Sequence, residues 1–461
     1  MGLDLSKYRD RVRSADLLPC RGRIVRIAGL TIESQGPPVG VGELCEIRTG
    51  DGRRVPAEVV GFQGAHRVLM PLENVDGVAP NDTVAARAVP RSILVGPRLL
   101  GRVINALGEP IDSKGPLAGA KRRALGGEPP PPLSRRRITE PLVFGLRAFD
   151  GLLTCGKGQR MGIFAGSGVG KSTLLGEIAR SSEADVNVLA LVGERGREVR
   201  HFLEESLGPE GLARSVVVVA TSDASPVQRV KAAFTAIAVA EHFRDEGKDV
   251  LMMMDSLTRF AMAQREIGLA AGEPPTTKGY CPSVFSVLPK LTERLGCADR
   301  GSITGVLTIL VEGDDMNDPV ADTVRSLLDG HCVLSRGLAE QGHYPAVDIL
   351  QSVSRLMDSV VSEEHLLAAQ RFRAICATYQ NAEDLINIGA FSAGSNRRID
   401  KAVSLIDRAN EFLRQPRGDR TGYDEMLAWL KDITDSWDFL MPADPQAQHG
   451  PPVPAGAGGE S

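Results

Sequence analysis

The chain has 461 residues, of which 42% are hydrophobic, and a formal net charge of -4. A chain of this length buries a large core and divides into several domains. The slight negative charge disfavours sequence-independent binding of nucleic acid, so we expect no nucleic-acid partner. The 7 cysteines contain no C-x-x-C pair, which disfavours a zinc or redox centre and fits a reducing cytosol.

Residues 1–21 contain the pattern of a short amphipathic helix that ends before Pro19. Its apolar face holds Leu5, Tyr8, Val12 and Ala15. The pattern leaves two roles open, packing on its own domain or docking on a partner. The chain has no uncharged apolar run long enough to span a bilayer, so any membrane contact is expected to be peripheral.

Residues 22–92 consist of short runs rich in β-branched residues, separated by Gly, Pro, Asn and Asp. This pattern is typical of a small β-barrel. A linker region follows, and its most irregular part is "GGEPPPPLSRRR" at residues 126–137. We expect its three arginines to form a solvated turn, with an anion site as the alternative.

The middle of the chain, residues 93–365, alternates apolar strands with helical stretches. The strands are "RMGIFA", "VNVLALVG", "SVVVVA", "DVLMMMD" and "TGVLTILVEG". Strands that are apolar throughout are buried on both faces, which predicts an α/β domain with a parallel sheet covered by helices. Residues 366–440 have a helical pattern, and the Pro-, Gly- and Ala-rich tail, residues 441–461, is expected to be disordered.

The stretch "FAGSGVGKST" at residues 164–173 predicts a phosphate-binding loop between a strand and a helix. Its glycines let backbone N–H groups close around phosphates at the positive end of the helix. Lys171 is expected to reach the β- and γ-phosphates and the Ser172 hydroxyl to ligate Mg²⁺. Ala165 stands where the pattern usually begins with glycine, and this is tolerable if the position has an ordinary φ.

Two carboxylates follow apolar strands elsewhere in the middle of the chain. Asp255 ends "VLMMMD", the placement of a carboxylate that holds Mg²⁺, although a helix cap is the alternative. Glu194 in "LVGERGREV" is a candidate general base for the attacking water. From spacing alone, a surface salt bridge with Arg195 or Arg197 is an equal alternative.

Several motifs, in register, resemble the rotary and protein-export hexameric ATPases that are related to the ATP synthase catalytic β subunit. They are "GRVINALGEPID", "GERGRE", "MDSLTRFA", "GSITG", "LSRGLAEQGHYPAVDI" and "SVSR", and the resemblance covers residues 22–435. It implies a β-barrel domain, a RecA-like nucleotide domain and a C-terminal helical domain, assembled as a six-membered ring with ATP and Mg²⁺ as cofactors.

The resemblance also assigns roles to single residues. It implies that Lys171, Glu194, Arg195, Asp255, Arg259 and Arg355 serve catalysis, with Ser172 and Asp255 as the metal ligands. Arg355 in "SVSR" matches the arginine finger that reaches the neighbouring subunit, and Tyr344 matches the tyrosine that stacks on adenine, although alone it reads as a core aromatic. The nucleotide-binding set is Gly166, Ser167, Gly168, Val169, Gly170, Lys171, Ser172, Thr173 and Tyr344.

Ala165 and the loop "AGEPPTTKGYCPSVF" look like the type III protein-export branch of this family, flagellar or injectisome. "AEDLINIGAFSAGSNRRIDKAV" at residues 382–403 looks more flagellar. This resemblance implies a homohexameric motor that hydrolyses Mg-ATP to unfold export substrates or to release them from chaperones. The expected partners are a stator-like regulator at the N-terminal helix, a central stalk, the export gate, chaperones and exported proteins. The expected location is the cytoplasm, at the inner face of the cytoplasmic membrane.

Three functions of different classes stay open. A rotary ATP synthase or ion pump would need a catalytically silent companion chain, whereas this chain carries Lys171, Glu194 and Arg355 together. An RNA-translocating helicase would present aromatic platforms in its N-terminal domain, and Phe62 is the one aromatic residue between residues 22 and 92. Protein export therefore ranks first.

Overall fold

The structure of the chain is a computed structural model that describes residues 20–437, apart from residues 88–91, 118, 312, 314, 316 and 317. The chain forms two compact units. The first contains residues up to 137, 158–167 and 184–328, and the second contains residues 138–157, 168–183 and those from 329 on. The predicted N-terminal helix and the predicted disordered tail lie outside the described residues.

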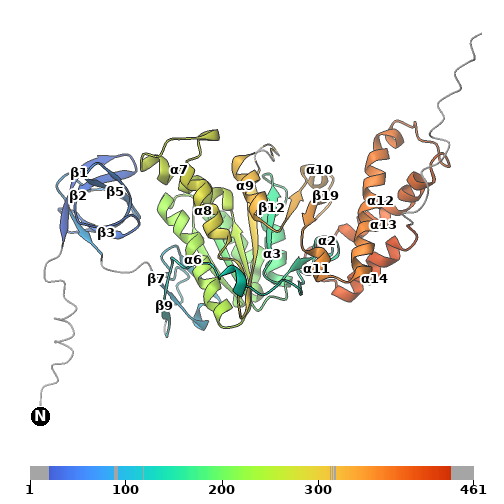
Figure 1. The fold of residues 1–461 in the computed structure, drawn as a ribbon, viewed down its shortest axis with the longest axis horizontal. Coiled ribbons are helices and arrows are strands. Elements are labelled where there is room, and N and C mark those ends of the chain that lie inside the picture. The colour runs from blue at the N-terminus through green and yellow to red at the C-terminus, as the bar shows by residue number, and fades with distance from the viewer. Residues whose placement is uncertain are drawn as a thin grey trace, which may run out of the picture. The chain divides into compact units, whose positions relative to one another are not determined.

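The first unit begins with a closed barrel (Figure 1). Its strands are β1 (Arg21–Ala28), β2 (Thr31–Gln35), β3 (Leu44–Arg48), β4 (Arg54–Gln63), β5 (His66–Pro71) and β6 (Thr83–Ala86), in the order β1-β2-β5-β4-β3-β6. Alternate residues point inward, as on β3, where Cys45 and Ile47 are fully buried. The predicted β-barrel is confirmed.

A parallel sheet forms the rest of the first unit's core. Its neighbouring strands are β12 (Arg160–Ala165), β17 (Ser302–Leu310), β15 (Asp249–Asp255), β13 (Val186–Val192), β14 (Ser215–Ala220) and β8 (Arg102–Asn105). Every residue of β13 and β14 is buried, because helices cover the sheet. The predicted α/β class and the five predicted strands are confirmed.

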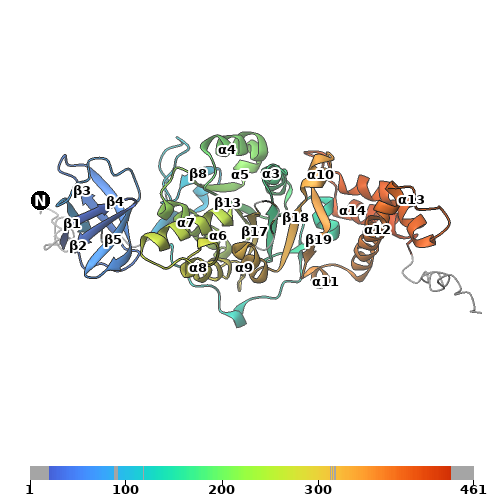
Figure 2. The same cartoon turned by 90° about the horizontal axis from the view of Figure 1, so that it is seen from above.

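The longest helices of this unit pack against the sheet. The helix α6 (Pro226–Asp245) contacts β13, β14 and β15, and α7 (Leu257–Ala270) lies beside it, followed by α8 (Pro282–Thr292) and α9 (Pro319–Leu327) (Figure 2). Ser225 and Ser256 cap α6 and α7 with their hydroxyls. Shorter elements are α4 (Gly196–His201), the π-helical η3 (Phe202–Leu207), α5 (Gly208–Ala213), β16 (Gly296–Cys297), and the pair β7 (Ser92–Val95) and β9 (Lys121–Ala124).

The linker differs from the prediction in two places. The strand β8 lies in it and joins the parallel sheet next to β14, and Arg102 at its start forms a bidentate pair with Asp112 at 2.7 and 2.9 Å. The predicted solvated arginine turn is wrong for Arg135, whose guanidinium donates to the Glu293 carboxylate and to the carbonyl of Leu295. Arg136 donates to the carbonyls of Ala298 and Gly301, so both side chains attach the linker to the first unit.

The second unit combines a hairpin with a helical domain. The hairpin strands β18 (Gly330–Leu334) and β19 (Val347–Ser354) pair antiparallel. The helices α12 (Glu363–Asn387), α13 (Arg397–Leu413) and α14 (Tyr423–Thr434) pack together, as Figure 1 shows. Short elements complete the unit: β10 (Pro141–Leu142), α2 (Arg147–Leu152), β11 (Cys155–Gly156), α3 (Lys171–Ser181), α10 (Arg336–Glu340) and α11 (Met357–Val360).

Aromatic rings and one arginine hold the helical domain together. The ring of Phe412 on α13 lies 5.3 Å from Phe372 on α12 and 5.6 Å from Trp429 on α14. Arg147 lies over the Trp429 ring at 4.8 Å and donates to the carbonyl of Phe412 at 2.8 Å. The predicted C-terminal helical domain is confirmed, and the boundaries predicted between residues 92 and 93 and between 365 and 366 stay predictions.

None of the helices among the described residues is long and apolar enough to cross a membrane.

Candidate nucleotide site

The phosphate loop runs from the end of β12 at Ala165 to the start of α3 at Lys171. Gly168 and Gly170 have φ of +82° and +93°, the left-handed conformation that only glycine adopts without strain. Ala165 is buried and paired with Leu310 in the sheet, so a side chain is tolerated there. The positive end of the 11-residue helix α3 therefore points into the loop, where it favours an anionic group.

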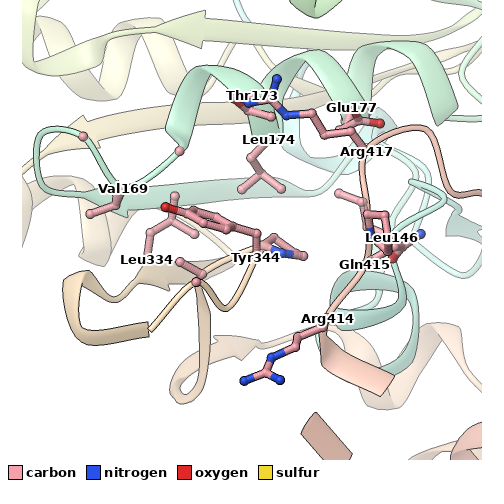
Figure 3. Close-up of a pocket in the computed structure, with 16 residues that line it drawn as sticks. Leu146, Val169, Thr173, Leu174, Glu177, Leu334, Tyr344, Arg414, Gln415 and Arg417 are labelled. Carbon is pink, nitrogen blue, oxygen red and sulfur yellow. Dashed lines mark hydrogen bonds between the residues drawn. The ribbon is translucent and has the colours of Figure 1, made fainter. Parts of the chain in front are cut away.

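A cavity of about 590 Å³ opens beside this loop in the second unit (Figure 3). Its walls include Gly168, Val169, Gly170 and Thr173 from the predicted binding set. Tyr344 also lines it, and a Cβ on Gly170 would lie 3.6 Å from the Tyr344 ring. Because Tyr344 is 48% exposed, it is no core aromatic, and its ring is available to a ligand.

Another wall comes from the loop between α13 and α14, which the sequence did not predict. Arg414, Gln415, Pro416 and Arg417 line the cavity together with Glu177 of α3. The Arg417 Nη2 donates to the Thr173 hydroxyl at 3.0 Å, and the Gly418 N–H donates to Glu177 at 3.3 Å. No sequence motif marks this loop, and its contacts with α3 join residues that are 244 and 241 positions apart.

His343 lies directly before Tyr344 and is 3% exposed. Burial and the charge of Arg414 lower the pKa of His343 below its usual value. The imidazole is therefore neutral near pH 7 and adds no charge beside Tyr344.

The first unit places further candidates at one edge of its sheet. Leu191 of β13 pairs with Asp255 of β15, so Glu194, three residues further on, follows the carboxyl end of the neighbouring strand. Gly166 and Ser167 follow β12 at the same edge. In parallel sheets this edge holds the ligand-binding residues, because the strand ends and the following loops meet there.

Asp255 is 4% exposed, and the Thr308 hydroxyl donates to its Oδ1 at 2.9 Å. Thr308 lies on the adjacent strand β17 and fixes the orientation of the carboxylate. The sequence did not predict this contact, although "GSITGVLTIL" places Thr308 two residues before the end of β17 at Leu310. Asp255 is not the cap of α7, since the Ser256 hydroxyl accepts from the Arg259 N–H instead.

Glu194 and Arg259 belong to elements in close contact. Gly193 has φ of +73°, and a Cβ there would lie 2.9 Å from the Arg259 Cβ. The Arg259 Nε is buried and has no hydrogen-bond partner among the described residues. A guanidinium whose buried Nε has an unused donor fits an anionic ligand. Arg195 pairs with Glu198 at 3.4 Å. The alternative of a salt bridge between Glu194 and Arg195 or Arg197 stays a prediction.

Arg355 belongs to the second unit and is not among the residues that line the cavity. It directly follows β19, its side chain is exposed, and its N–H donates to the Asp329 carbonyl at 2.9 Å. The structure thus brings Tyr344 together with the phosphate loop and Gly193, the residue before Glu194, together with Arg259, and it places Arg355 at the surface.

Three parts of the chain match known domains. Residues 24–87 match the β-barrel domain of the ATP synthase alpha/beta family, and residues 145–354 match its nucleotide-binding domain. Residues 361–432 match the C-terminal domain of the T3SS EscN ATPase. The flagellum-specific ATP synthase of Bacillus subtilis (strain 168) is 52% identical over 92% of this chain and 98% of its own length. The chain belongs to the flagellar and type III secretion ATPases. It is therefore an ATPase with a nucleotide-binding domain.

Other members of the flagellar and type III secretion ATPases are similarly close. The type 3 secretion system ATPase of Xanthomonas euvesicatoria is 49% identical over 90% of this chain and 94% of its own length. The assembled ATPase EscN from the type III secretion system of enteropathogenic E. coli superposes with a TM-score of 0.85 at 46% identity, covering 90% of this chain and all of EscN. A structure of EscN in complex with its central stalk EscO gives a TM-score of 0.83.

Proposed function

We propose that the chain hydrolyses Mg-ATP as a homohexamer and energises the export of flagellar proteins. The observation that carries this proposal is the phosphate loop, whose left-handed glycines lead into α3 beside a cavity that Tyr344 lines. Membership of the flagellar and type III secretion ATPases supports the coupling to export.

In this proposal the loop residues 166–173 bind the phosphates through their N–H groups and the positive end of α3. Lys171 neutralises the β- and γ-phosphates, and Tyr344 stacks on the adenine. Ser172 and Asp255 are the residues that would hold Mg²⁺. Their oxygens suit this hard cation, and Thr308 already orients the Asp255 carboxylate. When bound, Mg²⁺ would neutralise negative charge on the phosphoryl group that is being transferred.

Glu194 accepts a proton from the attacking water, so that the water gains nucleophilic character as it approaches the γ-phosphate. Arg259 stabilises the charge that develops on the phosphate oxygens, for which its buried and unused Nε is suited. Arg195, whose carboxylate partner Glu198 lies on the exposed start of α4, supports the Glu194 loop.

Arg355 acts on the neighbouring subunit as an arginine finger. Its exposed position after β19 supports this role, since a finger must reach beyond its own chain. Hydrolysis then depends on ring assembly, as the assembled state of EscN supports. The central stalk EscO of that ATPase supports a central stalk partner for this chain.

The remaining partners follow from the export role. The N-terminal helix would dock a stator-like regulator. The C-terminal helical domain would contact the export gate, the chaperones and the export substrates, which it would unfold or release from the chaperones. These contacts place the ring in the cytoplasm, against the inner face of the cytoplasmic membrane. An injectisome ATPase is the second candidate, because a type 3 secretion system ATPase is 49% identical.

The test is a chromosomal Lys171→Ala strain of the native organism, scored for swimming, secreted filament protein and membrane ATP synthesis. We expect loss of swimming and of secreted filament with unchanged ATP synthesis. Lys248→Ala is the matched control, because Lys248 is exposed and lies 3.8 Å from its nearest acid, Asp185. Normal swimming of the Lys171→Ala strain would contradict the flagellar proposal and favour the injectisome.

A further inference from the structure

The loop between α13 and α14 forms one wall of the nucleotide cavity (Figure 3). Gln415 anchors it, because this side chain is 7% exposed and its Nε2 donates to the carbonyls of Gly145 and Asp419 at 3.0 and 2.9 Å. Its Oε1 accepts from the Arg147 N–H at 2.9 Å, and its N–H donates to the Tyr344 carbonyl. The loop is thus fixed against the segment that carries Tyr344.

Arg417 is the cation that this loop presents to the phosphate loop. Its Nη2 donates to the Thr173 hydroxyl at 3.0 Å, in the first turn of α3. Among the described residues no carboxylate pairs with Arg417. Glu177, one turn further along α3, pairs with Arg180 and accepts from the Gly418 N–H. The positive charge of Arg417 is therefore not neutralised by an acid and stands at the end of α3 that attracts anions.

The position of Arg417 indicates which part of a nucleotide it meets. With Tyr344 on the base and Lys171 on the β- and γ-phosphates, the ribose and the α-phosphate lie between these two residues. A guanidinium offers a fork of donors that suits a phosphate group, and the Thr173 hydroxyl occupies only one of them.

We infer that Arg417 binds the α-phosphate of the nucleotide, so that the C-terminal helical domain contributes a cation to the site of its own chain. The inference rests on the proposed nucleotide binding by the phosphate loop. Because the loop joins α13 to α14, phosphate binding at Arg417 also ties the position of these helices to the presence of nucleotide.

The test measures the Kd of Mg-ADP for the full-length chain and the KM and kcat for ATP. We expect Arg417→Ala to raise both the Kd and KM about 10-fold, the loss of one charge-assisted hydrogen bond, with kcat changed less than about 3-fold. Arg417→Lys keeps the charge and should recover part of the affinity. Arg420→Ala is the matched control, because Arg420 lies on the same loop and, within the described part of the chain, donates only to the Arg180 carbonyl, at 3.5 Å.

Two readouts separate phosphate binding from other roles. A loss that is equal for ADP and 2′-deoxy-ADP supports the α-phosphate, whereas a loss for ADP alone would assign Arg417 to the ribose hydroxyl and overturn the inference. An unchanged Kd in Arg417→Ala would also overturn it. If the wild-type chain itself bound no Mg-ADP, the proposed function would fail instead, so the two failures are distinguishable.

Discussion

The buried His365 predicts a pH-dependent stability of the second unit. Its side chain is 0% exposed, its Nε2 lies 2.9 Å from the Gly151 carbonyl oxygen, and its Nδ1 lies 2.9 Å from the Tyr423 hydroxyl. A neutral imidazole satisfies both contacts by donating to the carbonyl and accepting from the hydroxyl. Burial and the charge of Lys431 lower the pKa of His365 below its usual value.

A lowered pKa means that the unfolded chain binds the proton more readily than the folded one. The contribution of His365 to the free energy of unfolding is therefore complete above about pH 6.5 and is lost as the pH falls toward the folded pKa. For one group the slope reaches at most about 1.4 kcal/mol per pH unit. Burial raises the pKa of Asp150, the residue before Gly151, to about 7. This shift makes the free energy of unfolding fall as the pH rises, which opposes the effect of His365. The pH dependence of the wild type must therefore be compared with that of a variant.

The variant is His365→Gln, which does not titrate and keeps an amide donor for the Gly151 carbonyl. We expect it to be about 1 kcal/mol less stable at pH 8, the net value of the lost Tyr423 hydrogen bond. This difference should shrink as the pH falls below 6.5, because only the wild type loses the His365 contribution.

Tryptophan fluorescence in urea suits this measurement, because the 2 tryptophans, Trp429 and Trp437, both belong to the second unit. His201→Gln, an exposed histidine of the first unit, is the control and should leave the transition unchanged at every pH. A difference between wild type and His365→Gln that stays constant from pH 8 to pH 5 would refute the reasoning.

Three further predictions concern named contacts. Asp112→Asn should destabilise the first unit by about 3 kcal/mol in circular-dichroism melts, because it removes the carboxylate that pairs with the buried Arg102. Glu204→Gln in the exposed Arg200 pair should leave the melts nearly unchanged, and equal effects of the two variants would contradict this. Thr308→Val should raise the Mg²⁺ concentration for half-maximal ATPase about 10-fold, since it removes a hydrogen bond that orients the Asp255 carboxylate, and an unchanged requirement would count against Asp255 as a ligand. Mixing Arg355→Ala with Lys171→Ala subunits should restore partial ATPase activity, because each supplies what the other lacks; no rescue would exclude a finger acting between subunits.

The sequence predicted those features that local patterns encode. The phosphate loop, the buried strands β12 to β15 and β17, and the barrel follow from glycine spacing, runs of apolar residues and turn residues. The four-residue strand β8 was missed because its place beside β14 depends on a distant partner, and short runs carry little pattern. Arg135 was assigned to solvent because its carboxylate partner, Glu293, lies 158 positions away.

The cavity shows the same division. Gly168, Gly170 and Thr173 belong to the phosphate-loop motif, so the sequence marks them, and the resemblance to a known family marks Tyr344. Gln415 and Arg417 have no such motif, and their importance arises only when the chain folds and brings their loop to α3.

The most direct test of the central claim is the ATPase rate of the purified Lys171→Ala chain, measured with Mg-ATP beside the wild type. The phosphate-loop account predicts that hydrolysis is lost while the urea transition of the variant in the absence of nucleotide stays where it is in the wild type. Wild-type turnover by a folded Lys171→Ala chain would contradict the account.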